Sequence, residues 1–212
     1  MATELIYNSI PASELELDAL EAAARLKIPL RYTNEYTDEL IGSCRERLLG
    51  AIDCRFCAVK TDVSYPHPER CSIDLGFGEF QSKSLYENLS GCTKAYIFAV
   101  TLGINVDRLI LRLSQISAAE HFITDALASA YAESACDCAE REIFKGAEHR
   151  RRYSPGYGDL PLELQPQILS VLNAGRLLNI SLSKSLLMTP KMSVTAIAGL
   201  LTQAMPRVYT EG

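Results

Sequence analysis

The run "KAYIFAVTLG", residues 94–103, constrains the fold most, because it is apolar at nearly every position. An apolar run of this length is typical of a strand that is buried on both faces. A second strand is expected in "CRFCAVKTDV". A third run, "RCSIDLGFGEF", alternates smaller or polar residues with Cys71, Ile73, Leu75 and Phe77, so one of its faces should be buried.

Helical periodicity occupies most of the remaining chain. It predicts helices from Ser13 to Pro29, from Thr37, from Val106 to Lys145 with a break near 114–117, and from Pro166 to Gly175. Two further apolar segments are joined through Pro190. The order of these elements lacks a regular strand–helix–strand alternation, which favours an α+β fold with a mainly antiparallel sheet flanked by helices. We expect one domain over residues 1–212, with an N-terminal α/β portion over about 1–103 and a second portion over about 104–212.

Composition excludes several classes of function. The chain has 212 residues and a net charge of -5, which argues against nucleic acid as the main partner. No apolar run is long enough to span a membrane, and the polar start "MATELIYNSIPASELE" does not resemble a signal peptide. A cytoplasmic location without membrane association is therefore expected.

The cysteines do not predict a disulfide scaffold or a metal site. There are seven, an odd number, and several lie in apolar runs. Cys54 and Cys57 form one CxxC pair, but a second matching pair is missing, and on a strand the two side chains would face opposite sides. A thiol or metal protein is thus a remote alternative. Hydrolase and dinucleotide-binding motifs are also missing, so no catalytic residue is predicted.

The segment "RRYSPGYGDLPLELQ", residues 151–165, has the features of a ligand-binding loop. Arg152 could bind a carboxylate through two parallel hydrogen bonds. Pro155 and Gly156 form a tight turn whose backbone polar groups could meet a ligand, while Tyr157 offers a ring face and a hydroxyl group. The competing interpretation is a plain surface turn beside a basic helix end.

A second candidate is Glu133, within the helical run "DALASAYAESACD". It adjoins a stripe of small residues that permits close packing, and it could reach a cationic ligand group such as an amine or a sulfonium. The alternative is an ordinary solvated carboxylate, because acidic side chains are seldom buried without a partner.

Four blocks of the chain resemble a known family. "RYSPGY" is similar to the R-x-x-x-G-Y signature of the activation domain of cobalamin-dependent methionine synthase, which binds S-adenosylmethionine. "GDLPLELQPQILSVL" continues the likeness, and "LSKSLLMTPKMSVTAIAGL" is similar to the family's L-T-E-S-x-x-M-x-P-x-x-S-V-S stretch. "DALASAYAE" resembles the family helix that ends in a ligand-binding glutamate. Together the blocks span roughly residues 106–200, and the chain looks most like the short, free-standing members of the family.

The resemblance implies a role for each candidate residue. Arg152 would bind the carboxylate of S-adenosylmethionine, and Glu133 would receive its positive end. The backbone at Ser154 and Gly156 would contact the amino-acid or adenosyl portion, and Tyr157 would pack beside the ligand.

The resemblance also implies a function without bond chemistry by the domain's own side chains. In the family, the domain presents S-adenosylmethionine to a corrinoid protein that has stalled as cob(II)alamin, while an electron donor such as flavodoxin supplies one electron. This chain would serve a separately encoded methionine synthase or a related corrinoid methyltransferase. Two departures favour an alternative, a capping module that no longer binds S-adenosylmethionine: Lys184 replaces the glutamate of L-T-E-S, and the family's N-terminal acidic ligand residue has no evident equivalent.

Overall fold

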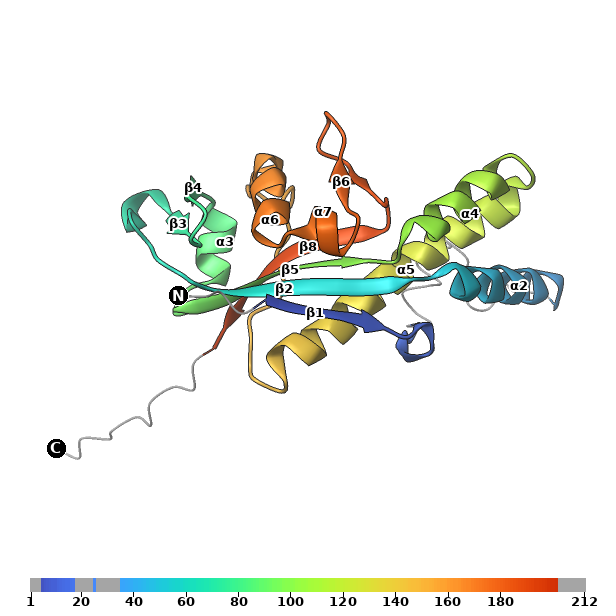
Figure 1. The fold of residues 1–212 in the computed structure, drawn as a ribbon, viewed down its shortest axis with the longest axis horizontal. Helices are drawn as coiled ribbons and strands as arrows, with labels where there is room; N and C mark the ends of the chain where they lie inside the picture. Colours follow the sequence, from blue (N-terminus) through green and yellow to red (C-terminus); the bar gives the residue numbers. More distant parts are fainter. Residues whose placement is uncertain (1–4, 18–24, 26–34, 202–212) are drawn as a thin grey trace.

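A four-stranded antiparallel sheet forms the centre of the computed structural model, which describes residues 5–17, 25 and 35–201 (Figure 1). Its strand order is β1-β2-β5-β8, and the strands are β1 (Leu5–Ile10), β2 (Cys54–Asp62), β5 (Lys94–Thr101) and β8 (Ser193–Leu200). Two small antiparallel pairs join β3 (Ser72–Asp74) to β4 (Glu79–Gln81) and β6 (Ser181–Leu182) to β7 (Met188–Thr189). The prediction of an α+β fold with a mainly antiparallel sheet is confirmed.

Helices cover both faces of the sheet (Figure 1). On one face lie α2 (Glu35–Ala51), α4 (Ile104–Ser114) and the long α5 (Ala118–Phe144). The other face carries α3 (Lys83–Asn88), α6 (Gln165–Val171) and α7 (Ala174–Leu177), with three short 3-10 helices at Ala12–Glu14, Pro68–Arg70 and Leu162–Leu164 elsewhere in the chain. The predicted break between α4 and α5 is present, because the Ser117 hydroxyl caps the first turn of α5 by accepting from the Glu120 N–H.

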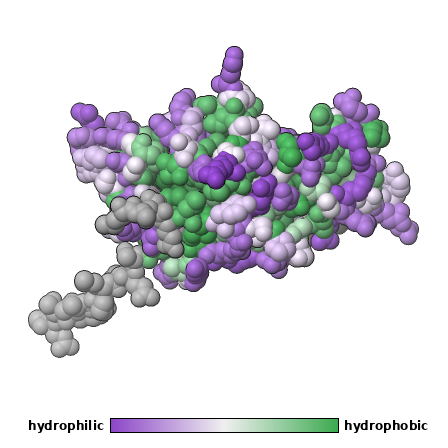
Figure 2. All heavy atoms as spheres, in the orientation of Figure 1, coloured by the Kyte–Doolittle hydropathy of each residue, from purple (hydrophilic) through white to green (hydrophobic). Residues whose placement is uncertain are grey.

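The central strand β5 explains why both faces are covered. Its side chains alternate between two separate apolar clusters, with Phe98 and Val100 in the cluster under α5 and Ile97 and Ala99 in the cluster under α6. All four are at least 98% buried. Figure 2 shows apolar residues gathered in the middle of one face of the molecule, with hydrophilic residues around its ends. The prediction that this strand is buried on both faces is confirmed.

One local prediction differs from the structure, and one strand was not predicted. The run around Ile73 is a β3–β4 hairpin rather than one strand, because Gly76 adopts a φ of 84° and its N–H donates to the Asp74 carboxylate. The edge strand β1 was not predicted. Most of the helix expected from Ser13 to Pro29 falls outside the described residues.

Candidate ligand-binding groove

The segment that carries Arg152 is attached by its backbone to β8. The Tyr153 N–H donates to the Ile197 carbonyl at 2.8 Å, and the Ile197 N–H donates back to the Tyr153 carbonyl at 2.9 Å. The Arg150 N–H donates to the Gly199 carbonyl at 2.8 Å. Arg152 therefore lies between two anchored positions of the backbone, which fixes where its side chain leaves the chain.

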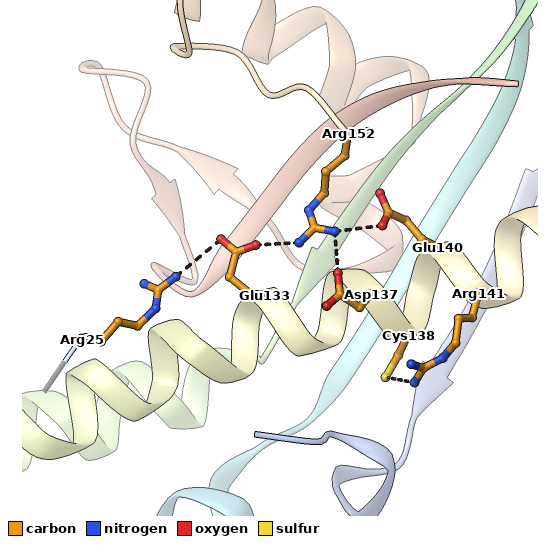
Figure 3. Close-up of polar contacts among 7 residues, drawn as sticks. All are labelled: Arg25, Glu133, Asp137, Cys138, Glu140, Arg141 and Arg152. Atoms are coloured by element: carbon orange, nitrogen blue, oxygen red, sulfur yellow. Dashed lines mark hydrogen bonds and ion pairs between the residues drawn. The ribbon is translucent and has the colours of Figure 1, made fainter. Parts of the chain in front are cut away.

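The guanidinium of Arg152 lies against three carboxylates of α5 (Figure 3). Its Nη2 donates to Glu133 Oε2 at 2.7 Å, and its Nη1 donates to Asp137 Oδ1 at 2.6 Å and to Glu140 Oε2 at 2.8 Å. The three acids are four and then three positions apart, so they share one face of the helix. We refer to Arg152, Glu133, Asp137 and Glu140 as the Arg152 cluster.

Burial and charge act against each other within the Arg152 cluster. The Arg152 side chain is 22% exposed and that of Glu140 only 12%. Burial tends to lower the pKa of Arg152, but its hydrogen bonds with Glu133 and Asp137 outweigh that effect and leave the pKa raised. Burial raises the pKa of Glu140 above its ordinary value, and Arg152 opposes this shift. A second arginine, Arg25, lies 3.7 Å from the other oxygen of Glu133.

The turn after Arg152 is closed by its own hydrogen bonds. The Gly156 N–H donates to the Leu160 carbonyl at 2.9 Å, and the Tyr157 N–H donates to the Ser154 carbonyl at 3.2 Å. Gly156 has a φ of 88°, as the sequence led us to expect of this turn, and Tyr157 is 67% exposed. The Gly156 N–H, which was expected to be available to a ligand, is thus used inside the loop.

The end of the loop is fixed to α3 through Asp159. Its carboxylate accepts from the Ser82 hydroxyl at 2.7 Å, the Lys83 N–H at 2.7 Å and the Ser84 N–H at 3.1 Å. The hydrogen bond from Ser82 is the main reason that the pKa of Asp159 is held well below its usual range. This carboxylate also lies at the helix N-terminus, where negative charge is favourable.

A groove with a volume of about 1300 Å³ runs between this loop, α5 and the β6–β7 hairpin. Four of the five predicted ligand-binding residues line it, namely Glu133, Arg152, Ser154 and Tyr157. Gly156 is adjacent in the loop but is not part of the lining. The lining also includes Leu187, Met188, Gln165 and Thr195.

The structure places Lys184 next to the groove. Its neighbours Ser183 and Ser185 line the groove, but Lys184 does not, so the departure from the family pattern lies beside the groove rather than in its wall. Conversely, Asp137 and Glu140 were missed as partners of Arg152. Their spacing from Glu133 along one predicted helix face was the available signal.

The CxxC pair takes no part in the groove. Cys54 belongs to the apolar cluster on one face of the sheet and Cys57 to the cluster on the other, as predicted for positions three apart on a strand. Burial raises the pKa of each thiol to about 12. Within residues 5–17, 25 and 35–201, no three His, Cys, Asp or Glu side chains come together as a potential metal site.

Comparison with known proteins supports one assignment, that of the fold. No family model matches the sequence, and no curated protein sequence matches it. The geometry described above is that of an α+β domain with a groove lined by charged residues beside one edge strand. A crystal structure of the MetH reactivation domain bound to AdoHcy is similar, with a TM-score of 0.66 and 15% identity over 95% of this chain and 80% of that chain. This chain therefore has the fold of the MetH reactivation domain, as its sequence blocks led us to expect.

None of the helices described is both long and apolar enough to cross a membrane.

Proposed function

We propose that this chain is an S-adenosylmethionine-binding reactivation module that supports reductive methylation of cob(II)alamin on a separate corrinoid protein, such as methionine synthase. The observation that carries the proposal is the meeting of Arg152 and Glu133 in one groove of a MetH reactivation-domain fold. The structure similar to this one was determined with AdoHcy, which shares the amino-acid and adenosyl parts of S-adenosylmethionine.

The charges of the groove suit the two ends of such a ligand. S-adenosylmethionine carries a carboxylate, an ammonium group and a sulfonium. Arg152 offers planar donors to the carboxylate, and Glu133 offers an acceptor to a cationic group beside it. In the structure these two side chains lie 2.7 Å apart, so a ligand carboxylate and a neighbouring cationic group could meet both at once.

The apolar residues of the groove suit the adenosyl part. Tyr157 and Leu187 are both about two-thirds exposed, at 67% and 66%, and both belong to the groove lining. A planar adenine that packs against them would remove apolar surface from water, which stabilises the complex. The volume of about 1300 Å³ leaves room for the whole ligand.

The role of this chain in the reaction would be to bind and orient the methyl donor. Cobalamin, carried by the partner, would supply the metal that accepts the methyl group, and a flavodoxin-like donor would supply the electron. Holding two reactants in register can lower a barrier by about 7–11 kcal/mol in favourable cases. No residue of this chain needs to act as an acid, a base or a nucleophile, so we assign it no catalytic residue and no independent enzyme activity. Residues 1–212 would act as one unit, because β8 of the C-terminal portion pairs with β5 of the N-terminal portion.

Calorimetric titration of S-adenosylmethionine tests the proposal. We expect the native protein to bind and Arg152→Ala to lose about tenfold or more in affinity, because hydrogen bonds to charged groups are worth about 1.5–3 kcal/mol. Arg151→Ala is the matched control, since Arg151 lines the same groove but lies outside the Arg152 cluster. Equal affinities for Arg152→Ala and the native protein would remove Arg152 from the site.

A second candidate function is a capping module that binds a corrinoid protein without S-adenosylmethionine. The observation that favours it is that three of the five N–H donors of Arg152 already donate to carboxylates of α5. The same titration, repeated in the presence of a corrinoid partner, separates the two functions. Absence of S-adenosylmethionine binding in both conditions, together with binding to the partner, would support the capping module and overturn the proposal.

A further inference from the structure

Arg152 enters the groove with part of its hydrogen-bonding capacity already used. A guanidinium has five N–H donors, and three of them donate to the carboxylates of the Arg152 cluster. Two of these acceptors, Asp137 and Glu140, share the single nitrogen Nη1. A ligand carboxylate that binds across Nη1 and Nη2 through two parallel hydrogen bonds must therefore compete with Asp137 or Glu140 for Nη1.

The three carboxylates differ in how easily they can leave. Glu140 is 12% exposed and does not line the groove, so moving it off Arg152 would strand a nearly buried charge. Asp137 is 56% exposed and lines the groove, so water can solvate it when it leaves. Glu133, at 37% exposed, is held from its other side by Arg25.

We propose that Asp137 is the exchangeable partner of Arg152, which the carboxylate of an amino-acid ligand replaces on Nη1 while Glu140 keeps the guanidinium in place. The inference rests on the proposed function, since it concerns how that ligand binds. Asp137 is then a specificity-determining residue, because a ligand carboxylate binds only if it competes successfully with Asp137 for Nη1 of Arg152.

The test compares two ligands that differ in one group, S-adenosylmethionine and its decarboxylated analogue, which keeps the sulfonium and the amine. The quantity measured by calorimetry is the ratio of their dissociation constants. Asp137→Asn removes the competing charge, so the preference for the carboxylate-bearing ligand should rise about two- to fivefold, as expected for one exposed ion pair. Asp137→Glu keeps a competing carboxylate and should leave the ratio near that of the native protein.

A control variant separates the effect of the Asp137–Arg152 contact from the effect of removing one negative charge. Glu148 is an exposed carboxylate in the loop after α5 and lies outside the Arg152 cluster, so Glu148→Gln removes one negative charge without touching Arg152. We expect Glu148→Gln to leave the ratio unchanged. If Asp137→Asn also leaves it unchanged while both ligands still bind, the inference is wrong and the proposed function stands. If neither ligand binds to the native protein or to Asp137→Asn, the proposed function itself fails.

Discussion

Replacement of Arg152 by methionine should destabilise the folded protein, because it leaves three carboxylates facing one another. Glu140 is nearly buried, so the loss of its ion pair with Arg152 accounts for most of the lost stability, about 2–3 kcal/mol. This value lies somewhat below the range for fully buried pairs. Glu133 and Asp137 are more than one-third exposed, so each adds only about 0.5 kcal/mol after solvent screening. The expected loss in the free energy of unfolding is therefore about 3–4 kcal/mol.

The destabilisation should depend on pH with a definite sign. Burial already raises the pKa of Glu140 in the folded state, and removal of Arg152 takes away the group that opposes this shift. A carboxyl group with a raised folded pKa costs stability only where it is ionised, so the cost grows as pH rises through that pKa. The deficit of Arg152→Met should consequently be larger at about pH 7.5 than at about pH 5.

Urea unfolding at both pH values measures this prediction. Arg151→Met is the matched control, because Arg151 is exposed and the ion pairs with α5 are made by Arg152 instead. The reasoning would be refuted if the two variants unfolded at the same urea concentration, or if the deficit of Arg152→Met were larger at the lower pH.

Three other outcomes are expected. Gly158→Ala should lower Tm, because Gly158 has a φ of 55° and an added Cβ would overlap the Tyr153 hydroxyl; the cost should be about 1–3 kcal/mol, and differential scanning calorimetry measures it. Asp159→Asn should be destabilising at neutral pH and nearly harmless in acid, because a depressed folded pKa contributes stability above the unfolded pKa and loses it as pH falls; thermal melts from pH 7 to pH 3 test the trend. Among the seven cysteines only Cys71 is not buried, so an aromatic disulfide reagent should react rapidly with one thiol in the native protein and with seven in urea, whereas rapid reaction of Cys57 would contradict its burial.

The sequence predicted those parts of the fold whose signals are local and strong. Strand β5 could be identified because the residues that point to either face of the sheet are nearly all apolar. The division between α4 and α5 could be identified from the polar break that ends in Ser117. Strand β1 could not, because at an edge of the sheet only Ile10 of its six residues is buried. What makes Leu5–Ile10 a strand is its pairing with β2, a contact between distant segments.

The sequence indicated residues that the structure brings into one groove, but it did not indicate the contacts between them. Glu133 and Arg152 were expected at opposite ends of a ligand, and the structure brings them into direct contact at 2.7 Å. Sequence spacing could not show this, because they are 19 positions apart and meet only through the packing of α5 beside β8. The spacing of Asp137 and Glu140 indicated that they share a helix face with Glu133, but not that Arg152 contacts that face.

The attachment of the loop to β8 affects which residues of this segment evolution would retain. The segment around Arg152 covers the side of β8 that faces away from β5, where unpaired backbone groups would otherwise invite aggregation. Its deletion would therefore harm the solubility of the sheet. Natural selection would keep this segment even in a descendant that had lost its ligand, so its persistence among relatives is weak evidence for binding. Retention of exposed groove residues, such as Tyr157 at 67% exposed, would be stronger evidence for ligand binding, because these side chains contribute nothing to the core.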